Sequence, residues 1–207
     1  SAVLIFQPAE EIGQGAKAML ADGLIDRFGV SRVYGMHNMP GIATGRFAIR
    51  AGAIMAAVAK FTIRIRGRGG HAARPQTTID PIVTGAQLID ALQAIVARGT
   101  DPVASLVVTI TRVIAGTASN IIPETIEIWG TTRSLDMENA AMAERRIREI
   151  SAGIAAASGA EIEVEYDQAH PVTFNRPEEA AFAAQIAREV AGDVDEDVRP
   201  VMAGEDF

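Results

Sequence analysis

Lys60-Phe61-Thr62-Ile63-Arg64-Ile65-Arg66 alternates strictly between polar and apolar side chains. Successive side chains of a β-strand point to opposite faces, so this pattern predicts a half-exposed antiparallel strand with one apolar and one cationic face. A glycine-rich turn from Gly67 to Gly70 follows, and after it comes His71. The stretch therefore predicts the first strand of a layered domain.

The elements that follow this strand have a recognisable order. Apolar residues recur at helical spacing over 80–98, strands are expected at about 104–114 and 124–133, and residues 136–158 predict a helix capped by Asp136. Residues 162–166 alternate again. The order βαββαβ is that of the ferredoxin-like split unit, and we place this domain at residues 55–168.

The segments on either side of this domain have α/β character. An apolar run over residues 2–6 ends at Gln7-Pro8, and because proline cannot extend a central ladder it predicts a buried parallel strand that stops there. Further strands are expected at 32–36 and 45–50, and helices at 12–23 and 177–191. The fold class is therefore α/β, with a partial α/β domain in two pieces, 1–54 and 169–207, around the inserted domain. We expect the chain to be a piece of a longer protein, with apolar faces uncovered in these two pieces.

Adjacent carboxylates follow the first predicted strand, and an imidazole follows the second. Open α/β sheets bind ligands outside the carboxyl ends of their strands, so Glu10, Glu11 and His37 are expected to lie together. Carboxylate and imidazole ligands suit zinc or manganese, and a spare carboxylate can act as a base. The alternatives are a solvated Glu-Glu pair at a helix start and a histidine without function.

Composition excludes several classes of protein. The net charge of −7 and the isoelectric point near 5.0 argue against nucleic acid as a partner. No apolar run approaches the roughly 20 residues of a membrane span, and no secretion signal is visible, so a cytoplasmic location without membrane contact is expected. The chain has no cysteine, so it contains neither disulfides nor thiolate ligands.

Six short motifs occur in order along the whole chain. They are Phe6-Gln7-Pro8-Ala9-Glu10-Glu11, Gly35-Met36-His37, Gly69-Gly70-His71-Ala72-Ala73-Arg74-Pro75, Asn120-Ile121-Ile122-Pro123, Gly130-Thr131-Thr132-Arg133 and Gly204-Glu205-Asp206-Phe207. In combination, these motifs resemble the M20 family of metallopeptidases and amidohydrolases, most closely its N-acyl-amino-acid hydrolases (hippurate hydrolase and auxin-conjugate hydrolase).

The resemblance implies a zinc-peptidase-like catalytic domain with two divalent metals, interrupted by a lid that also forms a homodimer. It implies that Glu10 is the general base and that Glu11 and His37 are metal ligands. It also implies that His71 reaches the active site of the other protomer and stabilises the oxyanion. From sequence alone, the alternative for His71 is a surface histidine in a turn. The glycine-rich turn before it could also suggest a phosphate loop, but this sequence lacks the Gly-Lys-Ser/Thr ending that such a loop needs.

Substrate contacts are implied at two further positions. Asn120 contacts the substrate by this resemblance, and its alternative is an Asx turn. The Arg133 guanidinium is suited to hold an amino-acid carboxylate, with a surface ion pair to Asp136 or Glu138 as the equal alternative. Glu205 and Asp206 are expected beside the active site.

Two ligand-bearing segments of the family fall outside this sequence, one upstream of residue 1 and one downstream of Phe207. Only Glu11 and His37 of the implied ligands remain, and catalytic zinc sites normally use three protein ligands. We therefore expect this chain alone to be inactive, with its site unfilled, and its parent to be an amidohydrolase of N-acyl amino acids or short peptides. The metal is zinc or manganese, with cobalt and nickel also compatible. The alternatives are an aminopeptidase or deacylase of a biosynthetic intermediate, and a non-enzymatic dimerisation or binding module.

Overall fold

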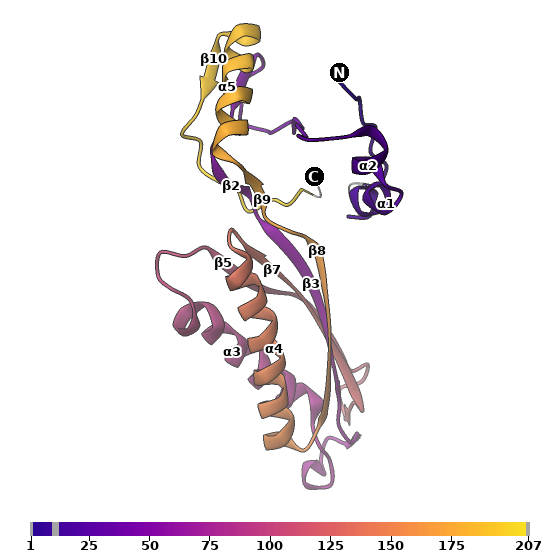
Figure 1. Ribbon diagram of the computed structural model, residues 1–207. Coiled ribbons are helices and arrows are strands. Elements are labelled where there is room, and N and C mark those ends of the chain that lie inside the picture. The colour runs from indigo at the N-terminus through magenta and orange to yellow at the C-terminus, as the bar shows by residue number, and fades with distance from the viewer. Residues whose placement is uncertain (1, 10–12, 206–207) are drawn as a thin grey trace. The chain divides into compact units, whose positions relative to one another are not determined.

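The computed structural model describes residues 2–9 and 13–205 (Figure 1). These residues divide into two compact units. Unit 1 contains the described residues up to Ala57 together with those from Ala169 onward, and unit 2 is Val58–Gln168.

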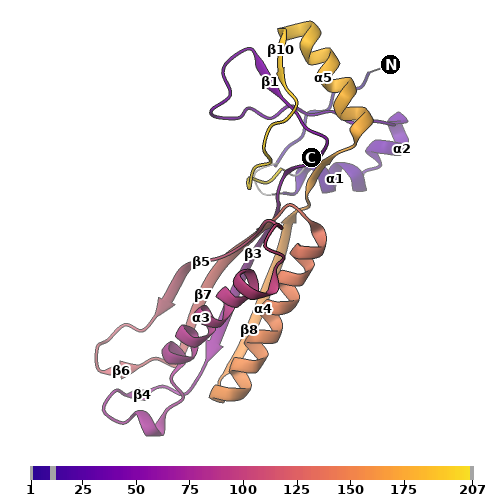
Figure 2. The same ribbon diagram turned by 90° about the vertical axis from the view of Figure 1, so that its left-hand side faces the viewer.

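Unit 2 is built on one four-stranded sheet with two long helices on one face (Figures 1 and 2). The sheet order is β5-β7-β3-β8, so the first strand of the unit lies inside the sheet and the last lies at an edge. β5 and β7 pair antiparallel over their whole lengths, with a bulge between Ile110 and Arg112. In chain order the elements are β3 (Ala57–Arg66), α3 (Pro81–Gly99), β5 (Leu106–Ala115), β7 (Thr125–Ser134), α4 (Met137–Ser158) and β8 (Glu161–His170).

The alternation of β3 is confirmed. Phe61, Ile63 and Ile65 are buried under the helices, whereas Lys60 and Arg64 are exposed on the other face. Because the buried positions are spaced two apart, every second side chain contributes to one continuous core. The largest buried partners of these residues are Leu88, Leu92, Ile95, Ile128 and Ile147.

Both helices of unit 2 start at an aspartate cap. The Asp80 carboxylate accepts hydrogen bonds from the backbone N–H groups of Ile82 and Val83, and the Asp136 carboxylate accepts one from Glu138. These caps satisfy N–H groups that have no partner within the helix. The helices predicted over 80–98 and 136–158 are therefore confirmed to within a residue or two.

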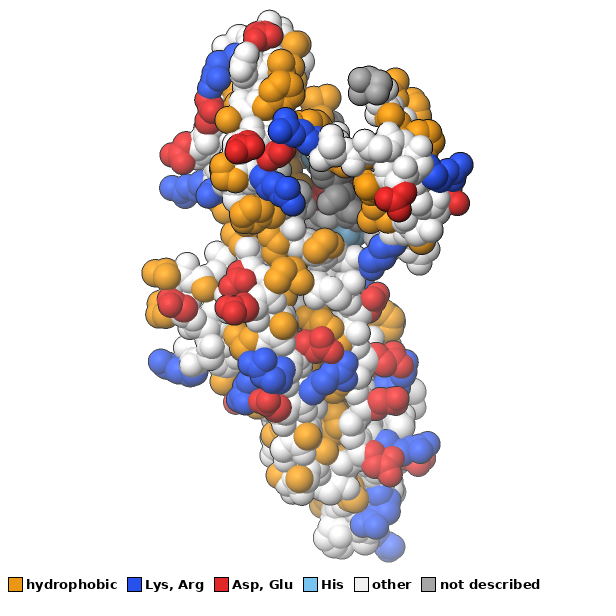
Figure 3. Space-filling model, viewed as in Figure 1, with side chains coloured by type: hydrophobic (Ala, Val, Ile, Leu, Met, Phe, Trp, Pro, Cys, Tyr) orange, Lys and Arg blue, Asp and Glu red, His pale blue; other side chains and the backbone are white. Residues whose placement is uncertain are grey.

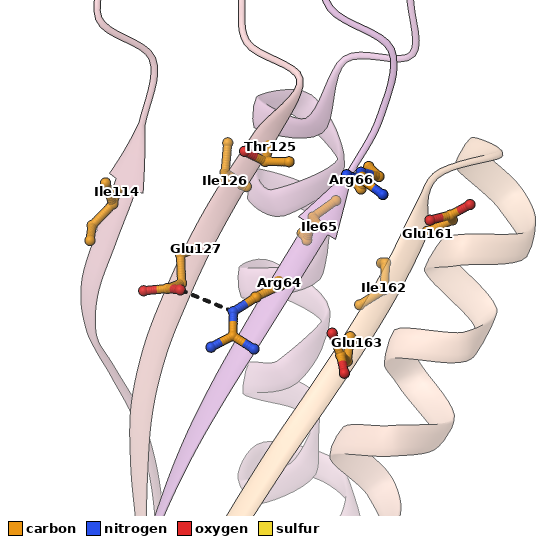
Figure 4. A pocket seen from close by; sticks show the side chains of 10 residues that line it. All are labelled: Arg64, Ile65, Arg66, Ile114, Thr125, Ile126, Glu127, Glu161, Ile162 and Glu163. Atoms are coloured by element: carbon orange, nitrogen blue, oxygen red, sulfur yellow. Dashed lines mark hydrogen bonds and ion pairs between the residues drawn. The ribbon is translucent and has the colours of Figure 1, made fainter.

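The face of the sheet opposite the helices carries charged side chains that bridge strands. The Arg64 guanidinium contacts Glu127 of β7 at 3.2 Å and Glu165 of β8 at 2.6 Å, and so links three strands (Figure 4 shows the contact with Glu127). Glu127 also accepts a hydrogen bond from the indole N–H of Trp129, and Arg112 of β5 lies over the ring of Trp129 at 5.5 Å. A chain of polar contacts therefore crosses all four strands. Basic and acidic side chains are interspersed on the face of unit 2 that Figure 3 shows.

A short two-stranded ladder forms the end of unit 2 beyond β3. β4 (Gly70–His71) pairs antiparallel with β6 (Ile121–Ile122), and η2 (Pro75–Thr77) lies in the loop that follows β4. Figure 2 shows this β4–β6 tip at the opposite end of unit 2 from the start of β3.

Unit 1 has only short strand pairs among the described residues. β1 (Arg46–Ala48) pairs parallel with β10 (Asp193–Asp195), and β2 (Gly52–Met55) pairs antiparallel with β9 (Thr173–Asn175). Its helices are α1 (Gly15–Ala21), α2 (Leu24–Phe28) and α5 (Pro177–Ala191), the last with the bounds predicted from sequence.

The strands predicted at 2–6 and 32–36 are wrong. Neither segment pairs with another strand in the described part of the chain, and Leu4 and Phe6 are 83% and 87% exposed. An apolar run becomes a strand only where a neighbour accepts and donates its backbone hydrogen bonds. The expectation of uncovered apolar faces is confirmed, since Met36 and Val190 are also largely exposed.

None of the helices in the described segments is long and apolar enough to cross a membrane.

Gly130 on β7 allows a close approach of the sheet to an aromatic ring. A Cβ atom at this position would lie 2.1 Å from Cζ of Phe61. We predict that Gly130→Ala lowers the free energy of unfolding by about 1–3 kcal/mol, because the ring must leave its packed position. Urea denaturation measures this, with Gly153→Ala in α4 as the control, since nothing lies within 4 Å of its added Cβ. Equal stability of the Gly130 variant and the wild type would contradict the packing described.

Glu127 makes the stability of unit 2 sensitive to acid. The indole hydrogen bond from Trp129, followed by the hydrogen bond from Arg64, lowers the pKa of Glu127 below its usual value of 4.5. A lowered pKa in the folded state contributes stability above pH 4.5 that is lost as the pH falls through the folded-state pKa. We predict that Glu127→Gln loses less stability than the wild type between about pH 6 and pH 3 in urea denaturation. Glu163→Gln, on the same face of the sheet, is the control and should behave like the wild type.

Candidate active site

Five of the residues predicted to form the site are described in the structure. Glu10, Glu11 and Asp206 lie outside the described residues. His37 and Glu205 belong to unit 1, and the others belong to unit 2, namely His71, Asn120 and Arg133.

His37 and Glu205 come together in unit 1 although 168 positions separate them in the sequence. The Nε2 atom of His37 lies 3.8 Å from Oε2 of Glu205, and the side chains are 44% and 16% exposed. His37 is in the loop after α2, and Glu205 follows the segment in which the backbone N–H of Ala56 bonds to the carbonyl of Ala203. This hydrogen bond anchors the C-terminal segment within unit 1, two residues before Glu205.

A backbone carbonyl sets which nitrogen of His37 carries the proton. The Nδ1 atom lies 2.9 Å from the carbonyl oxygen of Asn38, which can only accept a hydrogen bond. The neutral ring therefore has its proton on Nδ1 and a lone pair on Nε2. This lone pair and the Glu205 carboxylate are two electron-pair donors at short distance, an arrangement that a cation between them stabilises.

The His37–Glu205 pair offers the kinds of donor atom that a divalent metal ion binds. Imidazole nitrogen and carboxylate oxygen suit zinc and manganese, and the backbone carbonyl on the other ring nitrogen is a common orienting partner of a metal-ligating histidine. Zinc lies about 2.0–2.2 Å from such donors, so one ion can reach both atoms at a separation of 3.8 Å. The pair fits in donor type and spacing. In the described part of the chain, no group of three or more His, Cys, Asp or Glu is placed to hold a metal ion.

The β4–β6 tip holds His71 and Asn120 next to each other. His71 pairs in register with Ile121, and the backbone N–H of Ala72 bonds to the carbonyl of Asn120 at 2.9 Å. The His71 ring accepts a hydrogen bond from the backbone N–H of Ala73. Both side chains are exposed, and Asn120 lies in a turn. Two hydrogen-bonding side chains are thus presented together at the end of the unit.

Arg133 lies on the helix-free face of the sheet, near the other end of β3. Its Nη1 donates to the hydroxyl of Thr131 and to the carbonyl of Thr132, and the Thr131 hydroxyl in turn donates to the carbonyl of Ala59. These contacts hold the guanidinium in place through one of its nitrogens and leave the others for a ligand. Among the described residues Arg133 forms no ion pair with Asp136 or Glu138, and its hydrogen-bond partners are instead Thr131 and Thr132 of its own strand. Burial lowers the pKa of this guanidinium.

The shallow cavity at Arg133 has a mixed lining. Its volume is about 480 Å³, and Lys60, Trp129, Thr131, Glu165 and Asp167 line it together with Arg133. The positive charges of Lys60 and Arg133 are therefore partly offset by the carboxylates of Glu165 and Asp167. Glu165 is also paired with Arg64.

The sequence did not single out Thr131. It lies two positions before Arg133 in the same strand, and side chains two apart share one face of a sheet. This spacing could have indicated a role for Thr131, because a hydroxyl beside a guanidinium on the same face of a sheet is suited to orient the guanidinium. Local pattern carried no such signal for the contact between His37 and Glu205, and only the family resemblance placed Glu205 beside the active site.

Similarity to known proteins covers the whole chain. The sequence profile described as peptidase family M20/M25/M40 matches residues 1–207. A hippurate hydrolase of Campylobacter jejuni is 43% identical over 206 residues, which are 99% of this chain and 54% of that protein.

Solved structures show the same similarity. A putative aminohydrolase from methicillin-resistant Staphylococcus aureus aligns with a TM-score of 0.88 at 33% identity, over 97% of this chain and 52% of that one. A dinuclear metal-binding peptidase of the M20 family from Bacillus subtilis aligns with a TM-score of 0.77 at 34% identity, over 98% of this chain and 50% of that one. The chain spans about half the length of these relatives.

Proposed function

The chain belongs to peptidase family M20/M25/M40, and from this premise we propose that it is part of a divalent-metal-dependent amidohydrolase that cleaves N-acyl amino acids. The observation that carries the proposal is the contact between His37 and Glu205, which fits a divalent cation in donor type and spacing. The similarity to a hippurate hydrolase supports the substrate class, because hippurate is an N-acyl amino acid.

We propose Glu11 and His37 as metal ligands, with Glu205 and Asp206 beside them. Bound divalent cations supply Lewis-acid chemistry that polarises an amide carbonyl and lowers the pKa of water. The similarity to a dinuclear metal-binding peptidase supports two ions, and nitrogen and oxygen donors are compatible with zinc, manganese, cobalt or nickel. Glu10 is proposed as the general base that accepts the proton of the attacking water.

His71, Asn120 and Arg133 are proposed to contact the substrate. The ring of His71 and the amide of Asn120 are suited to hydrogen-bond the oxygen of the scissile amide, and the Arg133 guanidinium is suited to the amino-acid carboxylate. Thr131 is bonded to Ala59 near the start of β3, whereas the tip follows the end of that strand at Arg66. At about 3.3 Å per residue, the strand from Ala59 to Arg66 separates Arg133 from the tip with His71 by roughly 23 Å or more. This distance exceeds the length of a small acyl amino acid.

This separation supports a homodimer in which one substrate contacts His71 of one copy and Arg133 of the other. In this proposal unit 2 is a ferredoxin-like lid and dimerisation domain inserted into the catalytic domain of unit 1. The two edges of its sheet differ in character. β8 presents Glu161, Glu163 and Asp167, which repel the same strand of a second copy, whereas Val113 and Ile114 of β5 are about half exposed and uncharged. We propose that β5 forms the interface.

We also propose that this chain alone does not complete the reaction. It spans about half the length of its relatives, and Glu11 and His37 are the two ligands that we propose within it. Catalytic zinc sites normally use three protein ligands.

Metal binding by the isolated chain tests the proposed ligands. We predict that His37→Ala and Glu11→Ala each weaken zinc binding in equilibrium dialysis by about tenfold or more, because each removes a donor from an incomplete site. His71→Ala removes another exposed imidazole and should bind zinc like the wild type. Equal binding by the wild type and the His37 variant, or a loss in the His71 variant, would contradict the assignment.

The same metal-loaded samples test the reaction. Amine release from hippurate, from another N-acyl amino acid and from a dipeptide with a free amine should be absent with this chain. Turnover of acyl amino acids that is lost in Glu10→Gln would confirm the reaction and overturn the proposal of inactivity. Turnover of the dipeptide alone would instead favour the aminopeptidase alternative.

The dimer is tested by sedimentation. We predict that the chain sediments as a dimer and that Ile114→Lys is a monomer at the same concentration, because a charge on an edge strand opposes pairing between copies. Val103→Lys, in the exposed loop before β5, is the matched control and should remain dimeric. A monomeric wild type, or a dimeric Ile114 variant, would show that β5 is not the interface.

A further inference from the structure

The ring of His71 is held by the main chain two residues further on. Its Nδ1 atom lies 3.1 Å from the backbone nitrogen of Ala73. A backbone N–H can only donate, so Nδ1 must carry a lone pair in this contact. The single proton of the neutral ring is then on Nε2, which faces away from the turn.

The turn that supplies this N–H is itself fixed at several points. The N–H of Ala72 bonds to the carbonyl of Asn120 at 2.9 Å, and the N–H of Arg74 bonds back to the carbonyl of His71 at 2.8 Å. On the other side, β4 pairs with β6 through His71 and Ile121. The residues on both sides of Ala73 are thus bonded, and the contact with the ring is a consequence of the fold of the tip.

We propose that the backbone N–H of Ala73 is a positioning group that fixes His71 as the Nε2–H tautomer. The β4–β6 tip then presents a hydrogen-bond donor to a ligand oxygen, and it does not present an acceptor. Within the described residues no carboxylate lies within ion-pair distance of His71, so the amide of Ala73 is the group that orients the neutral ring.

His37 shows the opposite arrangement. Its Nδ1 faces a carbonyl oxygen, which leaves the lone pair on Nε2. The backbone thus prepares one histidine to donate electrons to a cation and the other to donate a proton in a hydrogen bond. The assignment of the His71 tautomer depends only on the contacts within the tip. The role of its Nε2–H group as a donor to an amide oxygen depends on the proposed function.

Nitrogen NMR of the ring measures the tautomer directly. Long-range ¹H–¹⁵N spectra of the ¹⁵N-labelled chain, recorded at a pH where the rings are neutral, distinguish protonated from unprotonated ring nitrogens. The signals of His71 are assigned by their absence from the spectrum of His71→Gln. The chain unfolded in urea gives the tautomer ratio of the same ring without the contact.

We expect the Nδ1–H fraction of His71 to be about fivefold lower in the folded chain than in urea, which is the change that one hydrogen bond of ordinary net strength gives. Ala73→Pro removes the N–H and should return the ratio toward that of the unfolded chain. Ala73→Gly keeps the N–H and should leave the folded ratio unchanged, which separates loss of the donor from loss of the side chain.

A folded chain with the same tautomer ratio as the unfolded chain would overturn the proposal, and this comparison does not depend on the folding of the proline variant. A folded Ala73→Pro chain with the wild-type ratio would overturn it as well. Neither result depends on metal binding or turnover, so failure of this inference is distinguishable from failure of the proposed function.

Discussion

Backbone pairing in the sheet β5-β7-β3-β8 is the constraint on which the rest of the structure depends. Because β3 lies inside the sheet, its apolar face can be covered by α3 and α4, and its other face can carry Arg64 between carboxylates of both neighbouring strands. The same strand also sets the distance between the candidate site residues. Arg133 is held near its start through Thr131, and the tip with His71 follows its end.

His37 and His71 differ in which ring nitrogen carries the proton, and this difference gives one residue type two chemical roles. A carbonyl oxygen next to Nδ1 of His37 leaves a lone pair on Nε2, and an N–H next to Nδ1 of His71 leaves a proton there. Neither contact requires another side chain. The sequence neighbours Asn38 and Ala73 supply them from the main chain, so the roles follow from local backbone conformation.

Unit 2 was largely predictable from sequence because its signals are local. Strict alternation in β3 and the amphipathic patterns that begin at Asp80 and Asp136 each specify an element without reference to the rest of the chain. The apolar segments at 2–6 and 32–36 had equally clear local signals and form no strands. Their hydrophobicity was read correctly, but a strand also needs a paired neighbour, and local pattern does not reveal one. Local pattern did not reveal the contact between His37 and Glu205 either, because two distant segments create it, and only the family resemblance placed Glu205 beside the active site.

Amide hydrogen exchange measured by mass spectrometry tests most directly whether pairing decides which segments are ordered. The account predicts strong protection across residues 58–66, 106–115 and 125–134, where the strands of unit 2 pair, and exchange near the unprotected rate at residues 2–6 and 32–36. Protection of residues 2–6 as strong as that of β3 would contradict it, because the segment would then have a strand partner that the structure does not contain.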